Sequence, residues 1–99
     1  MEVSFASHQL QRCYENSSQA DRTWGESVGR KYNQRIGIIK AARIFGDLYR
    51  IRSLRIHKLS GRRSDQFAIA LNDRWRLIVT YTEEDNLVLV EEVTNHYGD

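Results

Sequence analysis

The sequence has 99 residues, of which 40% are hydrophobic and 28% are charged, with a net charge of +2. This length predicts a single domain over residues 1–99 with a modest core. No apolar run approaches the roughly 18 residues that a membrane span needs, and the first residues lack a secretory pattern. The single cysteine, Cys13, excludes an internal disulfide bond and fits a reducing compartment, so we expect a cytoplasmic protein.

The charges are spread unevenly along the chain. Eleven of the 15 basic residues lie between Ser27 and Ser64, where Asp47 is the one acidic residue, and the rest of the sequence is acidic. A basic segment of this kind is typical of a protein that binds a polyanion. The alternative, long helices that carry Arg and Lys only as a solvated surface, must overcome the repulsion between like charges.

The first elements follow from hydrophobic periodicity. Residues 2–6 alternate between polar and apolar side chains and predict a short strand. Ser7 then stands where a helix-capping residue is expected. The short helix after it would bury Leu10, Cys13 and Tyr14.

A long second helix is predicted after a break at residues 16–19. Apolar residues recur at three- and four-residue steps from 20 to 45, and Gly46 is a natural helix stop. The four-residue spacing of Gly25 and Gly29 indicates a close approach by the first helix, although a frayed helix is the plainer explanation.

The rest of the chain has the pattern of strands. They are predicted at residues 54–59, 66–71, 75–81 and 87–94, with turns at 60–63, 72–73 and 82–86. We therefore expect an α+β protein in which two N-terminal helices pack on one face of a mainly antiparallel sheet of four to five strands. The other face would be partly open and able to hold a ligand.

Arg76 lies within an otherwise apolar predicted strand. Alternation places Trp75 and Leu77 on one face and Arg76 on the other, so Arg76 projects from the open face if its neighbours face the helices. There its guanidinium could hold a phosphate through two parallel hydrogen bonds. The alternative is a surface arginine paired with Glu91 or Glu92, two carboxylates that period two directs to opposite faces.

Two histidines are candidates for proton transfer. His57 precedes a basic turn that contains Gly61, and His96 follows the last predicted strand. Imidazole titrates near neutral pH and can exchange a proton with a ribose hydroxyl. The plainer alternatives to a catalytic role are that His57 is a half-exposed residue of a strand and that His96 belongs to a free C-terminal tail. Gly61 allows a positive φ, which would let Arg62 and Arg63 point towards a bound phosphate backbone.

Several other chemistries are excluded by what the sequence lacks. Two of its histidines and Cys13 do not provide the three or four ligands of a zinc site. A Gly-rich phosphate loop, a serine elbow and a helix-turn-helix pattern are missing as well. We therefore expect neither a metal nor a cofactor.

The runs IHKLSG, FAIALNDRWRLIVTY and VEEVTNHYGD resemble those of the HigB toxins, a branch of the RelE/ParE superfamily of bacterial type II toxin–antitoxin systems. The resemblance extends over essentially the whole chain. It implies two helices against a curved, mainly antiparallel sheet, and an mRNA interferase that cleaves codons in the ribosomal A site without a metal. It also implies a HigA-like antitoxin with a helix-turn-helix as the partner.

Position by position, the resemblance supports His57, Arg76 and His96 as catalytic residues, with Tyr97 as a substitute in proton transfer. Many relatives carry a lysine where this chain has Ser60, and often Asp-Tyr where it has residues 94–95. The residues that would bind RNA are Arg55, Lys58, Arg62 and Arg63. Lys58, Arg62 or Arg63 would supply the charge of the missing lysine.

The expected reaction is attack of the RNA 2′-hydroxyl on the adjacent phosphate, which leaves a cyclic phosphate and a 5′-hydroxyl. Arg76, with Arg62 or Arg63, would neutralise the charge that builds on the phosphoryl oxygens. His57 and His96 would act as base and acid, in an order that stays open. An aromatic side chain, Trp75 or Tyr97, could stack on a splayed base, although Trp75 also fits a core position.

Two other functions stay open. One is a non-nucleolytic toxin of the same fold, like the ParE branch, which acts on DNA gyrase and whose members generally lack the active-site histidines. The other is a binding module whose basic face docks an acidic antitoxin or RNA. Salt-sensitive RNA affinity without cleavage would indicate the binding module.

Overall fold

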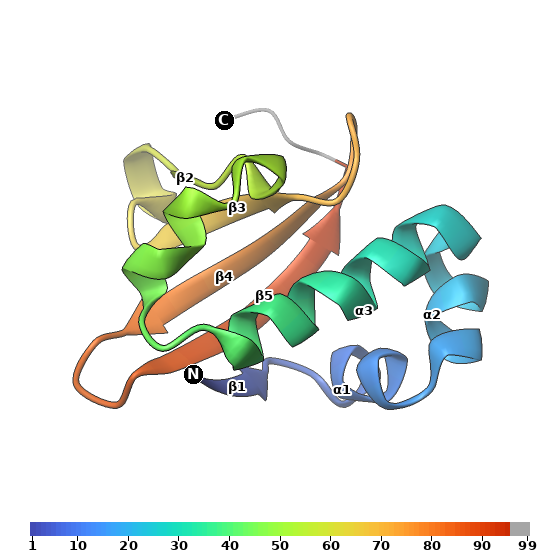
Figure 1. Cartoon of the computed structure of the whole chain (residues 1–99). Helices are drawn as coiled ribbons and strands as arrows, with labels where there is room; N and C mark the ends of the chain where they lie inside the picture. The colour runs from blue at the N-terminus through green and yellow to red at the C-terminus, as the bar shows by residue number, and fades with distance from the viewer. Residues whose placement is uncertain (96–99) are drawn as a thin grey trace.

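A single sheet forms one layer of the protein. The computed structural model describes residues 1–95, and in these the strand order is β1-β5-β4-β3-β2. β1 runs parallel to β5, and the remaining neighbours are antiparallel (Figure 1). The strands are β1 (Glu2–Phe5), β2 (His57–Lys58), β3 (Gln66–Ala70), β4 (Arg76–Thr82) and β5 (Leu87–Thr94).

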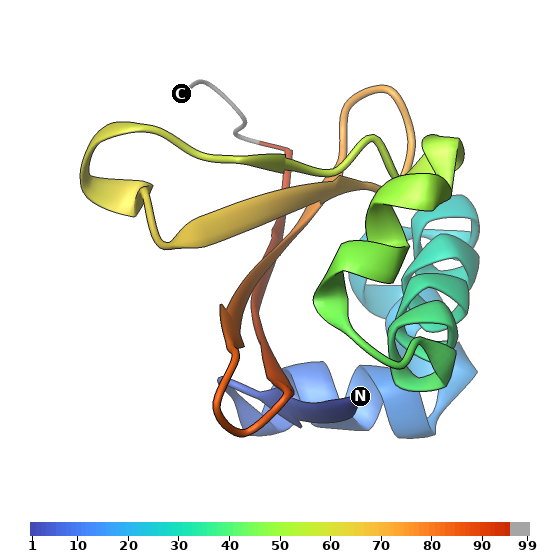
Figure 2. The same ribbon diagram turned by 60° about the vertical axis from the view of Figure 1, so that its left-hand side comes forward.

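Helices form the second layer. Figure 2 shows α3 and the 3₁₀ helices η1 and η2 on one side of the sheet, while the arm made by β2, η3 and β3 reaches away on the other side. This arrangement confirms the predicted α+β class. The helices are α1 (His8–Glu15), α2 (Ser17–Trp24), α3 (Glu26–Ala41), η1 (Phe45–Arg50), η2 (Arg52–Leu54) and η3 (Gly61–Arg63).

The expectation of one helix from 20 to 45 is wrong. Gly25 has a φ of 91°, a left-handed conformation that ends α2 and begins α3 in a new direction. The predicted break at 16–19 shrinks to Asn16, whose side chain accepts a hydrogen bond from the Ser18 backbone N–H at 3.1 Å. The apolar period continues across Gly25 because both helices bury a stripe against the same core, so periodicity alone could not reveal the bend.

Gly29 lies where α2 and α3 come closest. A Cβ at this position would lie 2.6 Å from Asp21 Oδ1 and 3.0 Å from the Ala20 carbonyl carbon. A close approach therefore occurs at Gly29, but the predicted neighbour is wrong, because the contact is with α2 and not with the first helix, and nothing lies within 4 Å of a Cβ at Gly25. Ser7 caps α1 as expected, because its hydroxyl accepts a hydrogen bond from the Leu10 N–H at 3.1 Å.

The core lies between the helices and one face of the sheet. Leu77 and Val79 of β4 are fully buried there, and Phe45 of η1 stacks on Tyr81 with ring centroids 4.7 Å apart. Tyr32 of α3 is fully buried and donates a 2.7 Å hydrogen bond to the Leu10 carbonyl, which joins α3 to α1. On the other face, Leu59, Ala68 and Ile78 form a small separate cluster.

The expected strand at 54–59 is shorter than the sequence pattern indicates. Residues 52–54 form η2, and Arg55 then has a φ of 46°, so that the strand conformation is confined to His57–Lys58. Gly61 has the positive φ, 67°, that its place in the basic turn predicts. Within residues 1–95, none of the helices is both long and apolar enough to cross a membrane.

Candidate functional site

The face of the sheet turned away from the helices carries the candidate site, and we call it the open face. Residues in register on neighbouring strands point to the same side of a sheet. His57 is in register with Ala68, Ala68 with Ile78, and Ile78 with Glu92. One step along the strands, Ala70, Arg76 and Thr94 form the next row. The fold thus places His57 and Arg76 on one face, as strand alternation predicts for Arg76.

The side chain of Arg76 is buried and not solvent-exposed. It is 7% exposed, and its Nη1 donates hydrogen bonds to the carbonyl oxygens of Asn72 at 2.6 Å and Trp75 at 3.0 Å. Both acceptors belong to the connection between β3 and β4. The guanidinium is therefore held in position at the floor of the open face, where partial removal from water strengthens its attraction for an anion.

His57 is exposed on β2. Its Nδ1 lies 3.4 Å from the carbonyl oxygen of Arg55, a contact that orients the ring. β2 and β4 are separated by β3, and Arg76 is two residues along β4 from Ile78, which is in the row of His57, so the backbones at His57 and Arg76 are about 12 Å apart. The residues of β3 between them are the small Ala68 and Ala70, both buried, and Ala68 packs with Leu59 and Ile78.

The four predicted RNA-binding residues differ in placement. Arg63 crosses the open face, because its Nε donates to Gln66 Oε1 at 2.7 Å and its Nη2 pairs with Glu92 Oε2 at 2.8 Å. Arg62 is exposed in η3. Lys58 is in register with Phe67, which alternation places on the face opposite His57. Arg55 is exposed at the end of η2.

A β-bulge brings two carboxylates to the open face. Ile78 pairs with Glu92 and Val79 with Val90, so Glu91 is the extra residue of β5. The Glu91 carboxylate accepts a 3.1 Å hydrogen bond from the Thr80 hydroxyl, while Glu92 holds Arg63. The expectation that Glu91 and Glu92 point to opposite faces is therefore wrong, because an inserted residue interrupts the alternation.

Two predicted catalytic residues, His96 and Tyr97, lie outside the described residues, and their roles stay predictions. Thr94 is in register with Arg76, so β5 ends in the same row as that side chain. Within residues 1–95, no group of three or more His, Cys, Asp and Glu side chains is arranged to hold a metal ion.

Several solved structures share this fold. YoeB in the YoeB–YefM complex from Staphylococcus aureus gives a TM-score of 0.60 at 18% identity, with 98% of each chain covered. The YoeB/ParE toxin from Agrobacterium tumefaciens gives 0.66 at 14% identity, covering 98% of this chain and all of that one. YafQ from E. coli gives 0.62 at 13% identity, with 98% of each chain covered. No curated protein sequence matches the chain.

Fold and sequence together define a toxin of a type II toxin–antitoxin system with a RelE-like fold. Residues 3–97 match the HigB-like toxin family, described as the RelE-like toxin of the type II toxin–antitoxin system HigB. Because the match extends over almost the entire sequence, the chain belongs to this family. The resemblance seen in the sequence is confirmed.

Proposed function

We propose that this toxin is a metal-independent endoribonuclease that cleaves mRNA in the ribosomal A site. The observation that carries the proposal is the open face, where the buried guanidinium of Arg76 and the exposed imidazole of His57 lie on either side of small residues of β3. The basic segment between Ser27 and Ser64 would attract the RNA backbone.

In this mechanism the 2′-oxygen of the RNA attacks the adjacent phosphate, and the bond to the 5′-oxygen breaks. Arg76 stabilises the negative charge that grows on the phosphoryl oxygens, a contribution of about 3 kcal/mol for one well-placed donor. His57 exchanges a proton with the attacking or leaving oxygen, and His96 or Tyr97 serves the other. A positioned acid or base contributes on the order of a hundredfold or more to the rate.

The chemistry can be tested on the RNA itself. Ribosome-bound mRNA should yield fragments with 2′,3′-cyclic phosphate and 5′-hydroxyl ends. A message with a single 2′-deoxynucleotide at the cleaved position should stay intact, because the internal nucleophile is missing. Cleavage of that deoxy message at the same position, or fragments with 5′-phosphate ends, would refute internal attack.

The role of His57 can be separated from folding because the side chain is exposed. His57→Gln should slow cleavage about a hundredfold and leave the melting temperature close to that of the wild type. His8→Gln is the matched control, since His8 is also exposed but lies on α1 rather than in the sheet. Equal cleavage rates for the two variants would show that His57 has no role in the reaction.

Arg76 requires a different design because it also supports the structure. Arg76→Gln should abolish cleavage and also cost about 1–3 kcal/mol of stability, since the carbonyl of Asn72 loses its donor. Arg76→Lys keeps the charge without the planar fork and should recover part of both losses. Rates are compared at a temperature at which circular dichroism shows each variant to be folded. Full cleavage by folded Arg76→Gln would show that this site is wrong.

For the partner we propose an acidic, HigA-like antitoxin with a helix-turn-helix, acting in the cytoplasm. The solved S. aureus relative is a complex of YoeB with YefM, which supports a toxin held by a partner protein. Expression of this chain alone should arrest growth and translation, and co-expression of the partner should restore growth. Arrest with intact mRNA and inhibited gyrase would favour the ParE-like alternative, and RNA binding without cleavage the binding module.

A further inference from the structure

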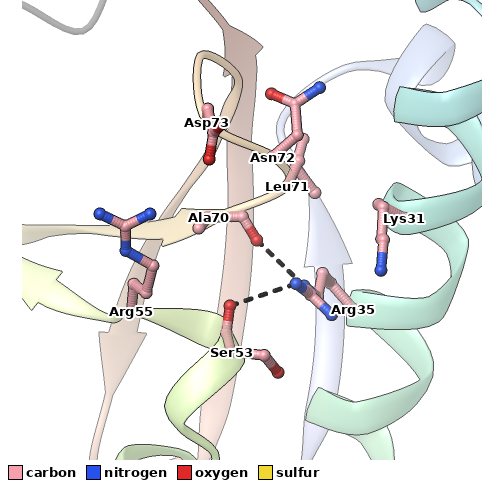
Figure 3. Close-up of a pocket in the computed structure, with 8 residues that line it drawn as sticks. All are labelled: Lys31, Arg35, Ser53, Arg55, Ala70, Leu71, Asn72 and Asp73. Carbon is pink, nitrogen blue, oxygen red and sulfur yellow. Dashed lines mark hydrogen bonds between the residues drawn. The ribbon is translucent and has the colours of Figure 1, made fainter.

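A cavity of about 300 Å³ lies where α3 meets η2 and the connection between β3 and β4 (Figure 3). Lys31 and Arg35 enter it from α3, and Arg55 from the end of η2. Its one acidic lining residue is Asp73, which is exposed. The lining thus carries a net positive charge. Ser53, Ala70, Leu71 and Asn72 complete the wall.

Arg35 is the unusual member of this set because it is only 5% exposed. Its Nε donates to the Ala70 carbonyl at 3.0 Å, Nη2 to the Ser53 carbonyl at 3.2 Å, and Nη1 to Gln34 Oε1 at 2.9 Å. All three acceptors are neutral oxygens, and they use three of the five N–H groups of a guanidinium. Figure 3 shows two of these bonds at the cavity wall.

The charge of Arg35 has no anionic partner in the chain as far as residue 95, where the ion pairs are Arg30–Glu26 and Arg63–Glu92. Burial lowers the pKa of Arg35, because desolvation disfavours its charged form. Keeping a cation buried without a counter-charge is costly unless another group offsets it. An anion in the cavity would provide that compensation.

The cavity shares its walls with the candidate site. The Arg55 carbonyl contacts the ring of His57, and the Asn72 carbonyl accepts a hydrogen bond from Arg76 at 2.6 Å. Arg55 also has a φ of 46°, a conformation that an arginine seldom adopts and that costs about 1 kcal/mol or more. The strained residue is thus the one whose carbonyl contacts His57 and whose side chain lines the cavity.

We propose that this cavity binds a phosphate of the RNA backbone beside the phosphate held at Arg76, with Lys31, Arg35 and Arg55 as its cationic ligands. The inference rests on the proposed RNA substrate. A strand that crosses the open face at Arg76 would continue over the β3–β4 connection into the cavity. A guanidinium that is already held by backbone carbonyls loses little freedom when it binds the phosphate.

The experiment uses an RNA in which every ribose is 2′-O-methylated, so that binding is measured without cleavage. Affinity is followed by fluorescence anisotropy from low to high salt. Lys31→Gln should weaken binding several-fold and reduce the slope of log K against log salt by about 0.7, the value of one phosphate contact on a single strand. Arg12→Gln is the matched control. It removes the same charge from an exposed residue of α1 that lies outside the basic segment between Ser27 and Ser64.

A second measurement observes Arg35 directly, without a substitution that could disturb folding. The NMR signal of its Nε–H should move when the methylated RNA is added, and inorganic phosphate at millimolar concentration should move it in the same direction. A glutamate-rich peptide should leave it unchanged. Movement with the peptide and not with RNA would overturn the proposal and assign the cavity to a protein partner.

The outcomes separate the cavity from the nuclease activity. If Lys31→Gln binds RNA like Arg12→Gln and the Arg35 signal stays fixed, the cavity proposal is refuted. The proposed function then still stands if the wild-type protein cleaves mRNA with dependence on His57. If the wild-type protein neither binds nor cleaves RNA, both proposals fail.

Discussion

The contact between α2 and α3 at Gly29 predicts opposite effects for the same substitution at two positions of one helix. In Gly29→Ala the new methyl group would meet Asp21 Oδ1 at 2.6 Å, the Ala20 carbonyl carbon at 3.0 Å and the Asp21 N at 3.0 Å. The carboxylate can rotate away, but the two backbone atoms can move only if α2 shifts. In Gly37→Ala nothing lies within 4 Å of the new methyl group.

Two free-energy terms decide each variant. Overpacking a tight contact costs about 1–3 kcal/mol, whereas alanine is favoured over glycine within a helix by up to about 1 kcal/mol. Gly29→Ala should therefore lose about 1–2 kcal/mol, because backbone atoms are involved. Gly37→Ala has only the favourable term and should gain up to about 1 kcal/mol.

Urea unfolding followed by circular dichroism measures both changes. For a domain of this size each kcal/mol also moves the melting temperature by about 4–8 °C. The reasoning about helix packing would be refuted if Gly29→Ala were as stable as Gly37→Ala. A loss at both positions would show instead that the end of α3 needs a flexible residue.

Glu92→Gln should cost less than about 1 kcal/mol of stability, because the Arg63–Glu92 pair has side chains 36% and 49% exposed. It should tighten RNA binding in the anisotropy assay, since a negative charge leaves the open face; weaker binding would contradict this. Burial raises the pKa of Tyr32 above its ordinary value of 10.0. The free energy of unfolding should therefore be unaffected by this group below pH 10. Above pH 10 it should fall by up to about 1.4 kcal/mol per pH unit, because Tyr32 ionises there only in the unfolded chain. Urea titrations at pH 9 to 11 should show a shallower loss for Tyr32→Phe. Ser7→Ala should cost about 1 kcal/mol in the same assay, by removing the α1 cap.

The parts of the site that could be predicted are those governed by strand alternation. β4 has a strong apolar pattern, so period two was sufficient to place Arg76 on the open face. Its burial could not be predicted, because that depends on carbonyl oxygens of the β3–β4 connection. The pairing of Arg63 with Glu92 joins residues far apart in the chain, and it depends on a β-bulge that leaves no pattern in the sequence.

The burial of Arg35 is indicated by its position in the hydrophobic period of α3. This arginine lies three residues after Tyr32 and four before Ile39, on the stripe of α3 that faces the core. Its charge makes it one of the eleven basic residues between Ser27 and Ser64, whereas its position in the helical period indicates burial. A charged residue in phase with a buried stripe is thus a stronger sign of a functional or structural role than its charge alone.

The strand order also constrains how the protein folds. Glu2 is in register with Leu87 and Phe5 with Val90, so the first strand of the chain completes the sheet only beside the last one described. Contacts between segments so distant require a large loop to close before any stabilisation is gained, and chains rich in such contacts fold slowly. A nascent chain cannot assemble the edge of this sheet until β5 has been synthesised. The row that contains Arg76 and Thr94 therefore forms late, so the toxin acquires its complete open face only after the residues up to Thr94 have been synthesised.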